Sequence, residues 1–351
     1  MVRAIAGATS TNWGMTTMSA ALRWALIGAT TIAREWMVNA IRENDGQIET
    51  VMSSDEARGR AFADEFGIPR STTSLDDVLR DVDAVYISTT NELHYAQCMA
   101  AARAGRHVLC EKPLATSYAD AAEMVEACRA AGVVMATNHH LRNAATHRAM
   151  RDVIETGALG RLLAGRIVHA GTLPIQMLGW RLKTAGAGAG ALLDLLVHDT
   201  DLLRFLTGDE PVEVMTFAQN GGLAIEGIED AAMSLIRFRS GFLAQAHDSF
   251  TTRAQETSCE IHGTDASLIA RSNMAQKPAG TVILRDKTGE RQLELDPEDY
   301  YVRGTRAFVA AVRGEGRPVA TGEDGLRSLA VALAARRSAH SGKAELVEGA
   351  G

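Results

Sequence analysis

The feature that most constrains the fold is an alternation of short apolar stretches and helical stretches in the first 140 residues. Residues 22–27, 48–52, 84–88, 107–110 and 133–137 have the length and composition of buried strands. Residues 32–43, 93–104 and 118–131 have helical spacing. Strands and helices that alternate in this way predict an α/β fold with a doubly wound parallel sheet. Such a sheet binds its ligands beyond the carboxyl ends of its strands.

The pattern changes after about residue 141. A long apolar helix is predicted over 187–206, and helices over 300–313 and 325–340 close the chain. Between them lie alternating stretches at 213–219, 231–239, 242–248, 257–261, 268–271 and 281–284. The sequence therefore predicts a second α/β domain with a large, mostly antiparallel open sheet over 141–351, after a nucleotide-binding domain over 21–140. Residues 1–20 have the composition of an unstructured leader, in which Met18 could be the true start.

Composition excludes several classes of function. The 36 basic and 43 acidic residues give a net charge of -7 without a basic block, which does not fit a nucleic-acid binder. Apolar runs are too short for a membrane span. The four cysteines are scattered, which argues against a disulfide framework and a zinc site and favours a reducing cytoplasm. We expect no metal, and a small molecule as the partner.

The first strand ends in a turn that resembles a dinucleotide-binding fingerprint. Gly28 and Ala33 occupy positions where that fingerprint has small residues, whereas Thr30 stands where it has glycine. The turn precedes a helix whose free backbone N–H groups suit a pyrophosphate. A tight turn without a ligand is the alternative.

The end of the second strand bears on the choice between NAD and NADP. Ser53 and Ser54 stand where an NAD enzyme would have an acidic residue, and Arg58 follows. Two hydroxyl groups and a guanidinium would bind a 2′-phosphate, so these residues favour NADP(H). Asp55 could still bind a ribose hydroxyl, and Arg58 could merely decorate an exposed helix.

Lys112 is one of only five lysines in the chain and follows a predicted parallel strand. Pro113 restricts the backbone there, so Lys112 should project at the ligand-binding edge. A lysine at this edge could polarise a carbonyl group and stabilise an alkoxide. A solvated loop lysine is the alternative.

Asp194 and His198 are four residues apart in the helix predicted over 187–206. That spacing puts both on one face, where Asp194 could orient His198 and raise its pKa, making it a proton donor. A structural ion pair is the alternative.

With these residues in hand, the chain resembles the glucose–fructose oxidoreductase and inositol dehydrogenase (Gfo/Idh/MocA) family. The resemblance rests on the glycine turn, on Glu111-Lys112-Pro113, and on the glycine-rich approach to Asp194 and His198. It implies an N-terminal Rossmann domain, a C-terminal α/β domain, and hydride transfer between a nicotinamide cofactor and a sugar or polyol.

Stretches beginning at Gly28, Ser88, Asn138 and Gly179 resemble the NADPH-dependent keto-sugar reductases of this family most closely. The resemblance implies Lys112, Asp194 and His198 as catalytic residues, although the sequence leaves open whether Lys112 or His198 donates the proton. It implies cofactor contacts from Gly28, Ala29, Thr30, Thr31, Ile32, Ala33, Ser53, Ser54, Arg58, Thr89, Thr90, Asn91, Glu92, Leu93, His94, Glu111, Lys112, Asn138, Trp180, Arg181 and Tyr301.

These residues predict an NADPH-dependent reductase of a cyclic keto sugar. An NAD-dependent sugar or inositol dehydrogenase that uses Asp55 is the first alternative. A non-catalytic NADP(H) sensor is the second, although it would have no use for a proton donor. The sequence leaves open whether the protein is a monomer or a homo-oligomer.

Overall fold

The structure is a computed structural model that describes residues 21–173 and 178–349; the predicted leader lies outside them. Its first sheet is six-stranded and parallel, in the order β3-β2-β1-β4-β5-β6. The strands are β1 Arg23–Ile27, β2 Gln47–Met52, β3 Arg70–Thr72, β4 Ala84–Ile87, β5 His107–Cys110 and β6 Met135–Thr137. This order confirms the predicted doubly wound sheet. The chain adds strands on one side of β1 up to β3 and then on the other side from β4. A ligand site is expected at this reversal, at the carboxyl ends of β1 and β4.

Helices connect the strands of this sheet, mostly where they were predicted. They are α1 Val38–Arg42, which continues a π-helical turn at Ala33–Met37, α2 Glu56–Phe66, α3 Leu75–Val78, α4 His94–Arg103 and α5 Tyr118–Ala130. The sequence interpretation missed β3, α2 and α3. The signal that could have found the two helices is capping, because Asp55 and Ser74 each accept a backbone N–H at their N-termini.

The second sheet has nine strands, in the order β14-β13-β12-β11-β7-β10-β9-β8-β15. All neighbours pair antiparallel except β7 with β10. The predicted strands are β8 Pro211–Gln219, β9 Ala231–Phe238, β10 Leu243–Ser249, β11 Ser258–Gly263, β12 Ala266–Arg271 and β13 Thr281–Asp286. The prediction missed β7 Leu162–Ala170, β14 Gly289–Gln292, β15 Glu345–Leu346 and the helix α6 Ala145–Glu155.

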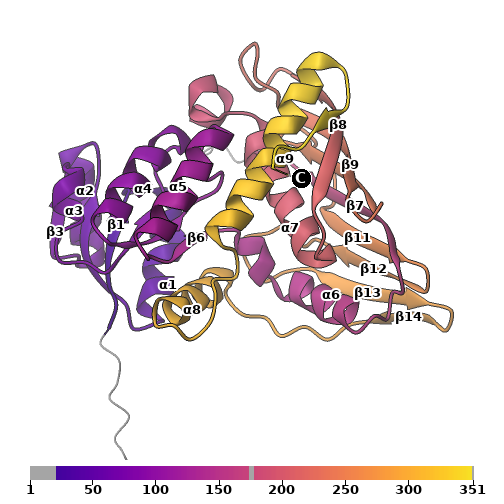
Figure 1. Cartoon of the computed structure of the whole chain (residues 1–351), viewed down its shortest axis with the longest axis horizontal. Coiled ribbons are helices and arrows are strands. Elements are labelled where there is room, and N and C mark those ends of the chain that lie inside the picture. Colours follow the sequence, from indigo (N-terminus) through magenta and orange to yellow (C-terminus); the bar gives the residue numbers. More distant parts are fainter. Residues whose placement is uncertain (1–20, 174–177, 350–351) are drawn as a thin grey trace, which may run out of the picture.

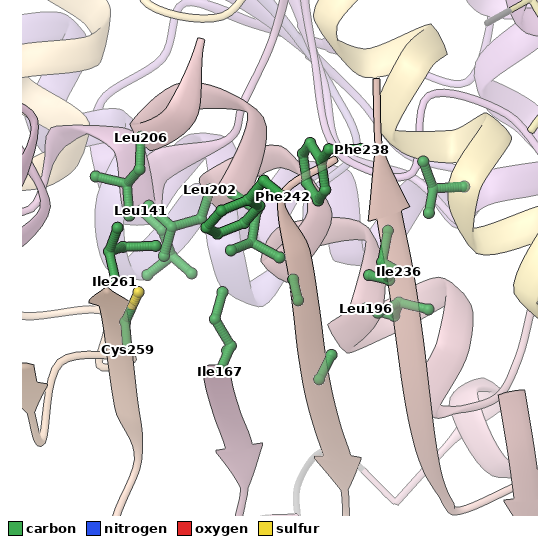
Figure 2. Packing of buried hydrophobic residues seen from close by; sticks show 14 of the residues in the cluster. Leu141, Ile167, Leu196, Leu202, Leu206, Ile236, Phe238, Phe242, Cys259 and Ile261 are labelled. Atoms are coloured by element: carbon green, nitrogen blue, oxygen red, sulfur yellow. The ribbon is translucent and has the colours of Figure 1, made fainter. Parts of the chain in front are cut away.

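One face of the second sheet is covered by α7, Val197–Thr207, which continues a π-helical turn at Leu192–Leu196. Figure 2 shows Leu196, Leu202 and Leu206 packed over strand residues such as Ile167, Ile236 and Ile261. The helix was predicted to begin at residue 187. It begins later because Gly188 and Gly190 have φ angles of +75° and +106°, outside the helical region.

The two C-terminal helices return to the first half of the molecule, and the last of them packs against both halves (Figure 1). In α9, Gly322–Ser341, Leu329 and Leu333 pack in the core beside the first sheet, whereas Val331 packs in the core of the second. In α8, Tyr300–Val312, Phe308 packs against Trp24 of β1, with ring centroids 5.3 Å apart. The strands before residue 140 form the first sheet and those after it form the second. The C-terminal helices follow no such division, so we propose a domain boundary near residue 140 for the two sheets and not for the helices.

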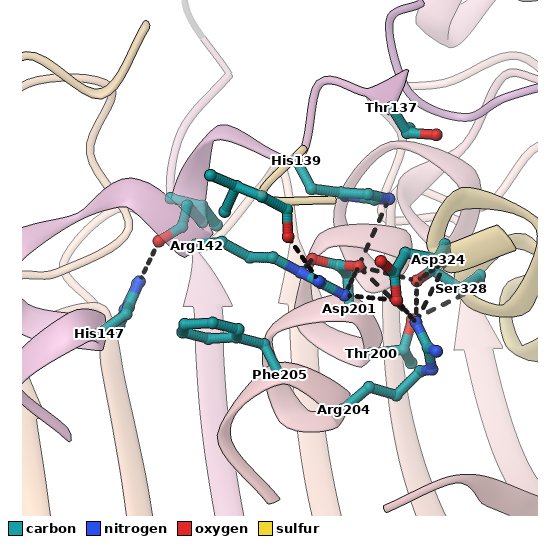
Figure 3. Close-up of polar contacts among 12 residues, drawn as sticks. Thr137, His139, Arg142, His147, Thr200, Asp201, Arg204, Phe205, Asp324 and Ser328 are labelled. Carbon is teal, nitrogen blue, oxygen red and sulfur yellow. Dashed lines mark hydrogen bonds and ion pairs between the residues drawn. The ribbon is translucent and has the colours of Figure 1, made fainter. Parts of the chain in front are cut away.

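A buried ionic network fixes α7 against its neighbours (Figure 3). Arg142 donates two hydrogen bonds of 2.7 Å to the Asp201 carboxylate, and its guanidinium also lies 3.1 Å from Asp324. Arg204 of α7 contacts Asp324 at 3.3 Å. Because Asp201 follows His198 by less than one turn, this network also holds the start of α7 in place.

Among the described helices, none combines the length and apolar character needed to cross a bilayer. All four cysteines are buried free thiols.

Candidate active site

Lys112 projects from the carboxyl end of β5 toward the start of the α7 segment. Its ammonium lies 2.7 Å from Asp194 Oδ1 and donates to the Asp194 backbone carbonyl at 2.8 Å. The Asp194 side chain is 9% exposed and that of Lys112 is 12% exposed. Two of the three ammonium hydrogens are thus fixed, which leaves one to interact with a substrate.

Asp194 is also bound by Arg181, whose Nε donates to Oδ2 at 3.1 Å. Burial alone would raise the pKa of Asp194, but the charges of Lys112 and Arg181 outweigh it and hold that pKa below its ordinary value. Asp194 is therefore an anion that orients the Lys112 side chain through its carboxylate and its backbone carbonyl.

The predicted pairing of Asp194 with His198 is wrong. Asp194 lies in the π-helical turn Leu192–Leu196, and among the described residues no hydrogen bond joins it to His198, whose Nδ1 has no partner there. The Asp194 carboxylate turns instead to Lys112 and Arg181.

His198 lies among other histidines. Its ring centroid is 5.0 Å from that of His140, 5.9 Å from that of His139 and 6.1 Å from that of His169. Burial, followed by the charge of Lys112, lowers the pKa of His198 well below its ordinary value. The predicted rise of this pKa is therefore wrong, and the His198 imidazole is neutral at neutral pH.

The first-strand turn has the shape that a pyrophosphate needs. Gly28 has a φ of +120°, and a Cβ atom there would lie 3.0 Å from the Ser88 hydroxyl oxygen, so a side chain would fill the space. The Thr30 and Ser88 hydroxyl groups are 2.8 Å apart, and Thr30 also accepts from the backbone N–H of Ala33. Residues 28–33, including Ala29, Thr31 and Ile32, thus link β1 to the first helix through a turn that fits a dinucleotide.

Ser53, Ser54 and Arg58 form a cluster at the end of β2. Arg58 Nε donates to the Ser53 hydroxyl at 3.0 Å, and Arg58 Nη2 donates to the Ser54 hydroxyl at 3.0 Å. Asp55 instead caps α2, with Oδ1 accepting from the Arg58 backbone N–H at 2.7 Å. One carboxylate oxygen of Asp55 is thus used as a helix cap, while two hydroxyl groups and a guanidinium lie together at the end of β2.

The loop after β4 brings further predicted contacts to the same edge. Asn91 is 4% exposed and its amide Nδ2 has no hydrogen-bond partner within residues 21–173 and 178–349, while Leu93 is 45% exposed. A Cβ atom on Gly188 would lie 3.0 Å from that amide nitrogen, so this loop meets the glycine-rich segment. Thr89 and Thr90 donate to Gln97 and Glu92.

Some predicted cofactor residues lie beneath this surface. His94 is 0% exposed, and its ring contacts the backbone carbonyls of Thr89 and Pro113. Tyr301 is 1% exposed and stacks on Trp36 and His140 at 5.2 Å. We therefore expect His94 and Tyr301 to position other groups, because neither has surface to offer a ligand.

Glu111 and Asn138, two further predicted cofactor residues, are hydrogen-bonded to each other. Glu111 Oε1 accepts from Tyr86 and from the Asn138 amide, each at 2.6 Å. Burial raises the pKa of Glu111. This network holds the ends of β5 and β6 together, next to Lys112.

Trp180 and Arg181 lie in a short helical turn, Trp180–Leu182, where the guanidinium lies 4.7 Å from the Trp180 ring centroid. Sequence reasoning missed the bond from Arg181 to Asp194, and it missed His169 altogether. His169 could have been found only by recognising β7, the strand that carries it. Gly165 and Arg166 interrupt the apolar alternation of that strand and conceal it in the sequence.

Comparison with known proteins gives a consistent result. Residues 22–139 match the GFO/IDH/MocA oxidoreductase family with an NAD-binding Rossmann fold, and residues 147–269 match the GFO/IDH/MocA C-terminal domain. The 1,5-anhydro-D-fructose reductase of Ensifer adhaerens is 54% identical over 328 residues, covering 93% of this chain and 98% of the relative.

Two more distant relatives extend the comparison. The myo-inositol 2-dehydrogenase of Thermotoga maritima is 27% identical, covering 90% of this chain and 96% of the relative. The crystal structure of aldose-aldose oxidoreductase from Caulobacter crescentus, complexed with glycerol, superimposes with a TM-score of 0.85 at 25% identity, covering 93% of this chain and 100% of that one.

Proposed function

Because the chain belongs to the GFO/IDH/MocA oxidoreductase family, we propose that it reduces a cyclic keto sugar with NADPH. The proposed substrate is 1,5-anhydro-D-fructose and the proposed product is 1,5-anhydro-D-mannitol. The observation that carries the proposal is the Lys112 ammonium, held by Asp194 at the carboxyl edge of the first sheet. The 54% identity to the reductase of Ensifer adhaerens supports the choice of sugar.

NADPH, when bound, supplies the hydride that reduces the carbonyl carbon. Residues 28–33 would hold its pyrophosphate, and Ser53, Ser54 and Arg58 would hold its 2′-phosphate.

Lys112 acts on the carbonyl oxygen. Its free N–H donates to that oxygen, stabilises the negative charge that develops there, and transfers a proton to give the alcohol. Asp194 and Arg181 keep the ammonium in place. His198 is neutral, so it contributes a hydrogen bond and not the transferred proton. Of the two proton donors that the sequence leaves open, Lys112 and His198, we therefore propose Lys112.

The Arg58→Ala variant tests the cofactor assignment. A charge-assisted hydrogen bond contributes ~1.5–3 kcal/mol, so the KM for NADPH should rise about 10- to 100-fold while the KM for NADH changes little. Steady-state kinetics with each cofactor measure this. Arg60→Ala is the matched control, because Arg60 lies on the same helix and forms an exposed ion pair with Glu56. Equal loss with both cofactors would contradict the assignment.

Oxidation of NADPH with 1,5-anhydro-D-fructose, glucosone and inosose tests the substrate, together with sugar or inositol oxidation by NAD. Rapid turnover of 1,5-anhydro-D-fructose with NADPH alone is expected. A strong preference for NAD and inositol would favour the alternative that the Thermotoga maritima relative suggests. Tight NADPH binding without any turnover would favour a sensor.

A further inference from the structure

A second polar cluster lies beside the Lys112 site and has no part in the mechanism above. It comprises His169 on β7, Asp248 on β10 and Asp199 on α7. His169 and Asp248 are direct neighbours across the one parallel strand pair of the second sheet. One possible ligand atom from each of the three residues lies within 4.8 Å of the others.

The two aspartates are in an apolar setting. Asp248 follows Ala244 and Ala246 on the inner face of β10, and both alanines belong to the core of the second sheet. Asp199 and Asp248 are each 0% exposed. A buried carboxyl group requires a partner that compensates for its lost hydration.

The visible partners do not suffice for two anions. His169 Nδ1 lies 2.8 Å from Asp199 Oδ1, but Asp199 Oδ2 and both oxygens of Asp248 have no donor among the described residues. Two ionised carboxylates would repel each other strongly in this setting. A single proton between them removes one charge and supplies the missing donor.

The surroundings indicate which residue carries that proton. Burial raises the pKa of both aspartates, and for Asp248 the charge of Asp199 raises it further. Asp199 Oδ1 already lies 2.8 Å from His169 Nδ1, whereas neither oxygen of Asp248 has a donor among the described residues, so Asp248 is the neutral acid that donates to Asp199. Asp199 remains the carboxylate, and it also accepts the Nδ1–H of His169.

This arrangement determines whether Nε2 of His169 is a hydrogen-bond donor or an acceptor. Burial lowers the pKa of His169. The titratable groups that face it are Asp199, 2.8 Å from Nδ1, the more distant Asp248, Lys112 and Asp194, and the neutral ring of His198. A neutral ring with the proton on Nδ1 has Nε2 as an acceptor. The side chain is 16% exposed, so the ring is accessible next to His198.

We propose that Asp199 and Asp248 share one proton and thereby hold His169 as the Nδ1–H tautomer, whose Nε2 accepts a hydrogen bond from a hydroxyl group of the sugar. The contact with the sugar rests on the proposed function, whereas the shared proton and the tautomer do not. Asp248 is then a positioning residue that acts through Asp199 and His169.

The tautomer is measured directly by ¹⁵N NMR of histidine-labelled protein, with His169→Gln used to assign the resonance. We expect the Nδ1–H form in the native chain and in Asp248→Asn, since the amide of asparagine replaces the acid as a donor to Asp199. We expect a doubly protonated His169 in Asp248→Leu, because Asp199 then keeps its full charge for the imidazole. An Nε2–H tautomer in the native chain would overturn the proposal without recourse to any variant.

Kinetics supply the functional test. In Asp248→Leu the KM for the sugar should rise about 3- to 10-fold through loss of an acceptor, with the KM for NADPH unchanged, whereas Asp248→Asn should behave as the native enzyme. Equal effects of the two variants on both KM values would refute a positioning role. A rise in the melting temperature of the native protein with Zn²⁺ or Mn²⁺, absent in Asp248→Asn, would show that a cation and not a proton joins the carboxylates.

Discussion

Replacing Lys112 by Met should reduce kcat for sugar reduction by about 100- to 1000-fold, the loss typical of removing one positioned donor to a developing oxyanion. Methionine has a similar length but no charge and no N–H, so it can neither stabilise the alkoxide nor supply a proton. The KM for NADPH should change little if the ammonium acts on the sugar oxygen. Steady-state and single-turnover rates of NADPH oxidation measure both quantities.

Two variants complete this experiment. Lys183→Met removes an exposed lysine and should retain native activity. Asp194→Asn should also lower kcat, because the ammonium then loses its ion partner. An active Lys112→Met enzyme would move the proton donor to another residue, and His198 would be the first to test.

The first sheet could be predicted closely from the sequence, because β1, β4 and β5 are buried almost along their whole length and their residues form continuous apolar runs. The central strand β7 could not. Its run contains Gly165, whose missing Cβ leaves space for the Phe242 ring, and Arg166, which faces solvent. The requirement for glycine there comes from a residue far along the chain.

The functional groups divide in a similar way. Lys112, Asp194, Ser53 and Arg58 could be placed because each follows a recognisable strand or lies in an apolar helix. Their partners could not always be placed. Helical spacing pairs Asp194 with His198, but Lys112 and Arg181 bind the Asp194 carboxylate from other segments of the chain, which helical spacing does not reveal. The neighbours His169 and Asp248 depend on strand register, which the sequence leaves open.

The protein should lose stability steeply as the pH falls from 7 to 5. Burial lowers the pKa of His139 to about 4, that of His140 to about 3 and that of His147 to about 4, from 6.5. The unfolded chain therefore binds protons below pH 6.5 that the folded protein does not bind until about pH 4, so stability is present above 6.5 and falls below it. Each such histidine should cost about 2 kcal/mol at pH 5.

The buried acids act differently in this range. The lowered pKa values of Asp194 and Asp324 mean that their contribution is lost only below 3.8, the ordinary value. The Asp199–Asp248 pair, which we propose shares one proton in the folded state, holds a proton that the unfolded chain does not bind in this range and so offsets part of the loss. Because these effects on stability oppose each other, the contribution of the buried histidines is best measured by replacing a single one of them.

His147 is the histidine to vary, because its neutral ring is fully bonded. Its Nδ1 contacts the Leu141 carbonyl at 2.7 Å, and its Nε2 lies 2.8 Å from the Asn273 amide nitrogen, so a second proton would break the latter bond. In urea unfolding at pH 7 and pH 5, His147→Gln should lose about 2 kcal/mol less than the native protein between the two pH values. His340→Gln, at an exposed position of α9, should lose as much as the native protein. If His147→Gln has the native pH dependence, then His147 takes up its proton over the same pH range in the folded and the unfolded chain, and the lowered pKa of the buried ring is excluded.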